Sequence, residues 1–178
     1  MQILSTTLKE ERLQKFRKKN VFQNSFFFTL SRMSNTISIY TDGACKMNPG
    51  KGGWGVFVKN SNEKLCGGEF HTTNNRMELT AVIESFKYLK QKNIFQSCIV
   101  HTDSQYVYNG ITKWRHGWKR NGWKNAKKQS VLNYDLWKQL DVLVEELGFV
   151  SFVWVRGHDG NCGNEMADML ANQGVLTL

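Results

Sequence analysis

The 178-residue sequence holds a single proline, Pro49, and no linker rich in glycine and serine. It also has no apolar run approaching the roughly 18 residues that a membrane-spanning helix needs. These absences argue against flexibly joined domains and against a membrane span. With 40% hydrophobic and 12% aromatic residues, the chain can bury a core. We therefore expect one globular domain that does not enter a membrane.

Cysteine motifs for metal or redox chemistry are missing too. The four cysteines are 21, 32 and 64 residues apart and form no C-x-x-C pair. No basic residue precedes Lys9, and no early apolar stretch has the length of a signal peptide. We expect reduced thiols in an intracellular protein of the cytoplasm or nucleus.

Positive charge is in excess and unevenly placed. The formal net charge is +9: residues 1–36 carry seven Lys/Arg against two Glu, and residues 37–178 carry 17 against 13 acids. This excess predicts an anionic partner, with nucleic acid the first candidate and an acidic membrane surface the second. We interpret residues 1–36 as a basic, poorly ordered N-terminal extension that could tether nucleic acid or carry a mitochondrial address. Glu10 and Glu11 argue against a mitochondrial targeting signal, since such signals are poor in acids. Met33, just before the first strand, leaves open where translation starts.

Residues 37–178 alternate between strand and helix patterns. Leu79, Val82, Ile83 and Phe86 recur at helical spacing within a helix expected over 72–93. Strands are expected at 37–44, 54–60, 64–72, 98–103 and 150–155, and a closing helix at 161–175. The first three strands are joined by turns and predict an antiparallel meander. This order indicates a mixed α/β domain with helices packed on a sheet.

Four acids fall in comparable places. Asp42 and Asp103 end strands, Glu78 lies in the first turn of a helix, and Asp168 lies in the last helix. Each alone is more simply a turn, capping or solvated residue. Gathered at one sheet edge, however, they would repel one another unless a cation were bound between them. Oxygen ligands alone favour Mg²⁺ or Mn²⁺, and hence phosphate chemistry.

Five segments in order resemble type 1 ribonuclease H in its bacterial form: YTDGACKMNPGKGGWG, TTNNRMEL, HTDSQYV, GITKWRHGWKRNGWK and VRGHDGNCGNEMAD. The resemblance covers residues 37 to about 175. It implies the ribonuclease H-like fold, a five-stranded mixed sheet with the first three strands antiparallel and helices on both faces. The implied activity is Mg²⁺-dependent endonuclease cleavage of the RNA strand of RNA–DNA hybrids, without sequence preference, leaving 5′-phosphate and 3′-hydroxyl ends.

The resemblance also assigns catalytic residues. The family's metal-binding acids correspond to Asp42, Glu78, Asp103 and Asp168. Two Mg²⁺ ions about 4 Å apart, with Mn²⁺ as a substitute, would activate a water and stabilise the leaving 3′ oxygen, and Asp42 would bridge them. From its Gly-flanked loop alone His158 is a surface histidine, whereas the family makes it a proton shuttle or an aid to product release. Asn164 is similar to an asparagine that positions this region.

A basic, aromatic stretch at 111–128 holds seven Lys/Arg, three Trp and no acid. It can be a solvated helix with its Trp residues packed on its own base, a grip for nucleic acid, or both. It resembles the family's basic protrusion, which holds the DNA strand. The contacts implied there are Trp114, Trp118, Lys119, Arg120, Trp123 and Lys124.

Further hybrid contacts are implied beside the acids: Cys45, Asn48, Asn74, Asn75 and Gln105. One of Asn74 and Asn75 could equally well cap the helix that follows. The family's pocket for a DNA phosphate corresponds to Thr73 and Asn133, but His71 stands where an arginine is common. Histidine is mostly neutral at pH 7 and lacks the arginine fork, so we expect weaker hybrid binding above pH 7 than a His71→Arg variant would show.

Two other functions fit part of the sequence. A catalytically silent hybrid-binding module would lack at least one of the four acids, and all four are present. Another metal nuclease of the same fold, such as an integrase or junction resolvase, would lack the Trp-rich stretch. Nothing in the sequence suggests more than a monomer.

Overall fold

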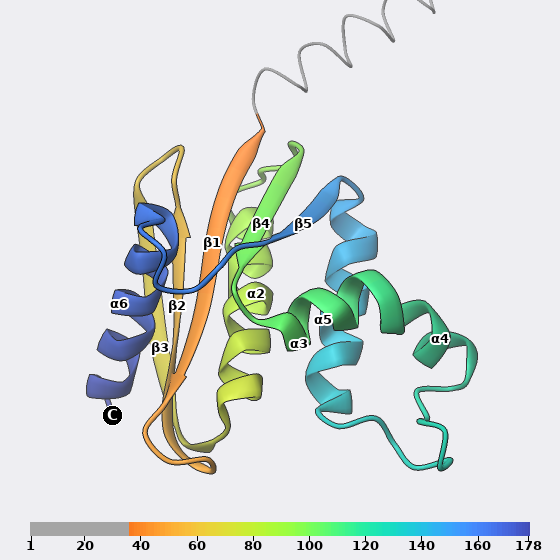
Figure 1. The fold of residues 1–178 in the computed structure, drawn as a ribbon. Helices are drawn as coiled ribbons and strands as arrows, with labels where there is room; N and C mark the ends of the chain where they lie inside the picture. The colour runs from red at the N-terminus through yellow and green to blue at the C-terminus, as the bar shows by residue number, and fades with distance from the viewer. Residues whose placement is uncertain (1–35) are drawn as a thin grey trace, which may run out of the picture. The chain divides into compact units, whose positions relative to one another are not determined.

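The computed structural model describes residues 36–178, and its strands form one mixed sheet in the order β3-β2-β1-β4-β5 (Figure 1). The pairs β1–β2 and β2–β3 are antiparallel, while β1–β4 and β4–β5 are parallel. The strands are β1 (Ile37–Cys45), β2 (Gly50–Val58), β3 (Glu63–Thr72), β4 (Cys98–Thr102) and β5 (Val150–Trp154). The meander and the mixed sheet are confirmed. Residues 1–35, where most of the basic extension is expected, lie outside the described residues.

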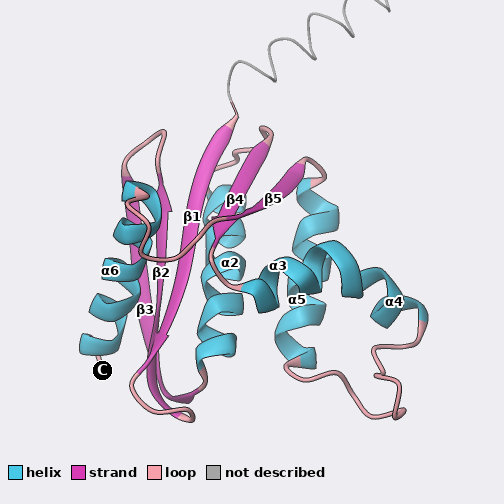
Figure 2. Cartoon of the chain, viewed as in Figure 1, coloured by secondary structure: helices cyan, strands magenta, loops and turns pink. Residues whose placement is uncertain are grey.

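Helices cover both faces of this sheet (Figure 2). They are α2 (Asn74–Gln91), α3 (Gln105–Asn109), η1 (Gly110–Trp114), α4 (Arg115–Arg120), α5 (Tyr134–Leu147) and α6 (Cys162–Leu176), with η1 a π-helical turn. The backbone of α6 lies directly on β2, because a Cβ at Gly55 would sit 2.2 Å from the carbonyl oxygen of Ala167. Gly55 is paired with Asp42 on β1, so this contact brings α6 close to that acid.

The core lies between the sheet and α2. The stripe predicted from helical spacing, Leu79, Val82, Ile83 and Phe86, is at most 1% exposed and packs against apolar residues of β1, β2 and β4. The helix begins after Thr73, whose hydroxyl accepts the Arg76 N–H at 3.4 Å. Thr73, and neither Asn74 nor Asn75, is therefore the cap.

The basic stretch is not one continuous helix. The chain runs from α3 through η1 into α4, and α4 ends at Arg120. Gly122 and Trp123 follow with φ of 63° and 61°, in the left-handed region that ends a helix. Within residues 36–178, no helix is long and apolar enough to cross a lipid bilayer.

Candidate active site

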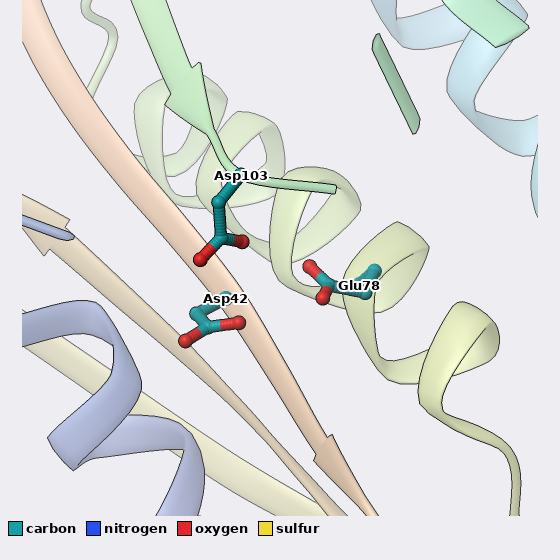
Figure 3. Close-up of side chains that lie close together, drawn as sticks. All are labelled: Asp42, Glu78 and Asp103. Atoms are coloured by element: carbon teal, nitrogen blue, oxygen red, sulfur yellow. The ribbon is translucent and has the colours of Figure 1, made fainter. Parts of the chain in front are cut away.

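Asp42 and Asp103 follow the last paired residues of two parallel strands. The ladder between β1 and β4 ends at Thr41 and Thr102, so the next residue on each strand is an acid. Side chains at equal register on parallel neighbours leave the sheet on the same face, and both carboxylates point into the same space (Figure 3). The strand β1 continues to Cys45 through its pairing with β2, so Asp42 lies within a strand and not at its end.

Glu78 reaches these strand ends from α2. A Cβ on Gly43 would lie 2.3 Å from the backbone nitrogen of Glu78, so glycine is needed for the helix to approach β1 this closely. Glu78 is the fifth residue of α2, just beyond the first turn in which the sequence placed it. The Thr73 cap makes Asn74 the first helical residue, which places Glu78 at the start of the second turn.

Oxygen atoms of Asp42, Glu78 and Asp103 lie within 4.8 Å of one another. The Gly43 N–H donates to Asp42 Oδ1 at 2.7 Å, and the Asn74 amide donates to Glu78 Oε1 at 3.4 Å. Burial, followed by the charge of Asp103, raises the pKa of Asp42 to about 8. Burial and the charge of Asp42 likewise hold the pKa of Glu78 well above its ordinary value. Among residues 36–178, no cationic side chain is a cause of these two pKa shifts.

The donor set suits a hard divalent cation. All three side chains offer oxygen ligands, and Glu78 Oε2 is buried without a hydrogen-bond partner. A buried carboxylate oxygen without a partner is costly, and a cation among the carboxylates would remove that cost. Mg²⁺ and Mn²⁺ prefer carboxylate oxygen, so the residues fit such an ion.

Asp168 lies on α6, outside the group of three. Its charge contributes to the raised pKa of Asp42, which places it near the site. Its Oδ1 accepts a hydrogen bond from the Asn172 amide at 3.1 Å, and the same amide reaches the Asp168 carbonyl at 3.0 Å. Sequence analysis missed Asn172, although its position four residues after an acid on a helix was a usable signal.

Asn164 forms a hydrogen bond with one of the acids, whereas His158 does not. The Asn164 amide donates to Asp103 Oδ2 at 2.9 Å, and the residue is 2% exposed at the start of α6. His158 is exposed, with φ of 55°. In the part of the chain that the structure describes, no hydrogen bond or ion pair involves it, so its catalytic role remains a prediction.

Comparison with known proteins identifies the family. The RNase H family model matches residues 34–176. The chain belongs to the ribonuclease H family. A ribonuclease HI of Neisseria meningitidis serogroup B is 60% identical over 145 residues, spanning 80% of this chain and 97% of that protein. A ribonuclease H of Albidiferax ferrireducens is 57% identical over 144 residues, spanning 79% and 95%.

Solved structures agree with this assignment. LC9-RNase H1, a type 1 RNase H with the type 2 active-site motif, is 33% identical with a TM-score of 0.70, covering 80% of this chain and 72% of that one. LC11-RNase H1 in complex with an RNA/DNA hybrid is 23% identical with a TM-score of 0.61, covering 79% and 97%, and shares the fold. The type 1 family, the fold and the enzyme class, a hydrolase that cuts RNA internally, are confirmed. The relatives named are bacterial and give a mitochondrial address no support.

The hybrid contacts predicted beside the acids lie on elements or loops that carry those acids or directly follow them. They are Cys45 at the end of β1, Asn48 in the following loop, Asn74 and Asn75 at the start of α2, and Gln105 at the start of α3. Asn48 Oδ1 accepts the Asn74 N–H at 3.1 Å, which joins the loop to α2. Contact with nucleic acid remains a prediction for each.

The two residues of the predicted phosphate pocket begin different helices. Thr73 precedes α2, and Asn133 precedes α5. Arg76 binds both carboxylate oxygens of Asp135 at 3.0 and 2.7 Å, which ties these helix starts together. His71 is exposed near the end of β3, and its effect on hybrid binding remains a prediction.

In the basic protrusion, the stretch at 111–128, the Trp rings pack on one another and on α5, although Trp114 is 40% exposed. The Trp114 and Trp118 rings are 5.6 Å apart at 52°, and Trp118 meets Trp137 of α5 at 5.3 Å. The ring of Trp123 packs edge-on against Tyr134 at 6.0 Å. Packing is therefore confirmed for Trp118 and Trp123, but against α5 and not within one helix, and contact of the Trp residues with nucleic acid remains a prediction.

Some cations of the protrusion already pair with acids of α5. Lys119 contacts Asp141 at 3.0 Å and also binds Glu145, so its charge is already matched. Arg120 and Lys124 are exposed. Sequence analysis missed a buried pair: Arg115 Nη1 lies 3.0 Å from Asp141 Oδ1, at ion-pair distance but without hydrogen-bond alignment. The signal was an acid within the apolar face of α5.

Proposed function

We propose that the chain hydrolyses the RNA strand of RNA–DNA hybrids with two divalent cations, leaving 5′-phosphate and 3′-hydroxyl ends. One observation carries this proposal: three carboxylates, two of them buried, converge where β1 and β4 separate, and within residues 36–178 no cationic side chain is among the groups that set the pKa values of Asp42 and Glu78. Family membership supplies the substrate class, and a solved relative of the same fold is bound to an RNA/DNA hybrid.

Asp42, Glu78, Asp103 and Asp168 would hold the cations, Mg²⁺ for preference and Mn²⁺ as a substitute. Such ions, when bound, supply positive charge to the attacking water and to the leaving 3′ oxygen. The protein supplies rigidity: Gly43 holds Asp42 through its N–H, and Asn164 holds one oxygen of Asp103. Asp42 interacts with each of the other three acids, which favours it as the shared ligand.

His158 would accept or deliver a proton at the scissile phosphate. Its loop lies between β5 and α6, and its side chain is exposed to a substrate that covers the acids. An imidazole suits this task because it exchanges protons near neutral pH.

The hybrid would lie across the acids and against the basic protrusion. The exposed cations Arg120 and Lys124 would contact the phosphates of the DNA strand, while Cys45, Asn48, Asn74, Asn75 and Gln105 would border the RNA strand. Phosphate contacts carry little sequence information, so cleavage would not depend on sequence. Strand choice would come from the 2′-hydroxyl, which only the RNA strand carries.

The decisive experiment uses an 18-mer RNA–DNA hybrid, duplex RNA and duplex DNA, each incubated with Mg²⁺ or with EDTA. We expect cleavage of only the RNA strand of the hybrid. The Asp42→Asn substitution should lower the cleavage rate about 10³-fold or more, because a shared cation ligand is lost. Glu165→Gln, which neutralises an exposed acid of α6, is the matched control and should cut like the parent protein.

Tight binding of the hybrid without cleavage would instead establish the silent binding module. Cleavage of duplex DNA or of four-way junctions at a comparable rate would favour another nuclease of this fold. Mass spectrometry of the product termini tests the expected 5′-phosphate and 3′-hydroxyl.

A further inference from the structure

Tyr106 connects the acids to the start of α5. It is the second residue of α3, which begins two residues after Asp103. Its hydroxyl accepts hydrogen bonds from Asn133 Nδ2 at 3.2 Å and from Trp137 Nε1 at 2.8 Å. The same hydroxyl donates to the carbonyl oxygen of Leu132 at 3.2 Å. Both lone pairs and the proton of this one group are therefore used at the start of α5.

These partners fix the direction of each hydrogen bond. The indole N–H of Trp137 can only donate, and the carbonyl of Leu132 can only accept. The Tyr106 hydroxyl therefore gives its proton to Leu132 and must accept from Asn133, so the amide nitrogen of Asn133 faces the hydroxyl. That nitrogen carries a second hydrogen, which Tyr106 does not use.

Asn133 does not use its side chain in the ordinary way. It precedes α5 with φ of 57°, and its side chain makes no capping hydrogen bond. An asparagine at this position usually accepts from the first N–H groups of its own helix. Here the side chain is turned to a residue of α3 instead, so the orientation of the Asn133 amide depends on Tyr106.

Packing holds the Tyr106 ring independently of its hydroxyl. The ring meets Trp137 edge-on at 5.5 Å and Trp114 at 6.4 Å. A phenylalanine can keep both contacts, because only the oxygen is lost. The hydroxyl can therefore be removed while α3, the protrusion and α5 stay packed together.

We propose that Tyr106 is a positioning residue for hybrid binding: its hydroxyl orients the Asn133 amide toward a phosphate of the DNA strand. Because Tyr106 is three residues from Asp103, it also fixes the distance from that phosphate contact to the acids that act on the RNA strand. This inference rests on the function proposed above and on the DNA-phosphate pocket that the family resemblance predicts at Thr73 and Asn133. Losing the hydroxyl should weaken binding and leave the acids unchanged.

The first test is Tyr106→Phe, with steady-state cleavage of the 18-mer hybrid in Mg²⁺. We expect KM to rise about threefold to tenfold, the equivalent of one hydrogen bond, with kcat within about twofold of the parent value. The control is Tyr108→Phe, which removes a hydroxyl from the same helix and should change neither constant. Thermal unfolding checks that both variants are folded. An unchanged KM in Tyr106→Phe, or a fall in kcat alone, would overturn the proposal.

A double-mutant cycle with Asn133→Ala tests the route of the effect. If Tyr106 acts through Asn133, the double variant should show the KM of Asn133→Ala alone, whereas independent roles would multiply the two increases. Multiplied increases would overturn the proposal. If Asn133→Ala cleaves the hybrid with the parent KM, the phosphate contact and this inference both fail while the ribonuclease function stands. If the parent protein does not cleave the hybrid at all, the proposed function itself fails.

Discussion

The acid cluster of Asp42, Glu78 and Asp103 and the buried base of the protrusion handle charge in opposite ways. In the cluster, three like charges approach within 4.8 Å, and burial raises the pKa values of Asp42 and Glu78. At the base of the protrusion, the buried Asp141 faces Arg115 and Lys119. Both regions bury carboxylates, but within the described part of the chain only the second has cationic side chains at ion-pair distance.

This difference separates a structural charge from a functional one. A buried pair such as Arg115 and Asp141 is complete within the fold and can anchor the protrusion to α5 without help. The acid cluster is incomplete within residues 36–178, and its cost to the fold falls only when positive charge arrives from outside.

The largest effect is expected from Asp141→Asn, which leaves Arg115 buried without its counter-charge. We expect the free energy of unfolding to fall by about 2 to 4 kcal/mol, because breaking a buried pair exposes the full desolvation cost of the remaining ion. Urea unfolding monitored by fluorescence measures it. Glu145→Gln, which removes the exposed partner of Lys119, should cost much less, because solvent screens that pair. Equal losses in the two variants would show that the buried pair does not anchor the protrusion.

A smaller effect is expected from pH in metal-free protein. The pKa of Asp42 is about 8 in the fold against an ordinary value of 3.8, so the folded state holds a proton that the unfolded chain releases. Stability in EDTA should therefore fall as pH rises from about 4 to about 8, and Asp42→Asn should be more stable than the parent protein at pH 8 by about 1 to 3 kcal/mol.

Urea midpoints at pH 5 and pH 8 measure this difference. Adding Mg²⁺ at pH 8 should stabilise the parent protein and have little effect on Asp42→Asn, because the cation replaces the proton in offsetting the carboxylate charges. The expectation would be contradicted if, in EDTA, the urea midpoint of the parent protein fell between pH 5 and pH 8 by no more than that of Asp42→Asn.

The smallest effect concerns the exposed cations of the protrusion. The Lys124→Gln substitution should weaken hybrid binding about twofold to fivefold, because one phosphate contact is lost. It should also reduce, by about 1, the steepness with which the logarithm of the binding constant falls with the logarithm of the salt concentration. Lys59→Gln, which neutralises an exposed lysine next to the start of β1, should leave the slope unchanged. Fluorescence anisotropy across a salt series in EDTA measures both. Parallel salt dependences would exclude Lys124 as a contact.

Much of the fold could be predicted because its signals are local. The stripe Leu79, Val82, Ile83 and Phe86 identifies α2 by spacing alone, and turn residues separate the strands of the meander. The interior position of Asp42 within β1 could not be predicted, since the length of that strand is set by its partner β2. Nor could the Thr73 cap be chosen over its neighbours, because Thr, Thr and Asn in succession can each cap a helix.

The sequence by itself determined which chemical groups are present: four carboxylates in comparable places, a basic aromatic stretch, and motifs in the order of one family. Tertiary structure decided which of these groups meet. Gly43 and Gly55 let α2 and α6 approach the sheet, and the parting of β1 from β4 after Thr41 brings Asp42, Glu78 and Asp103 together while Asp168 stays beside them. Distances between residues far apart in the chain follow from packing and strand register, which no local pattern encodes.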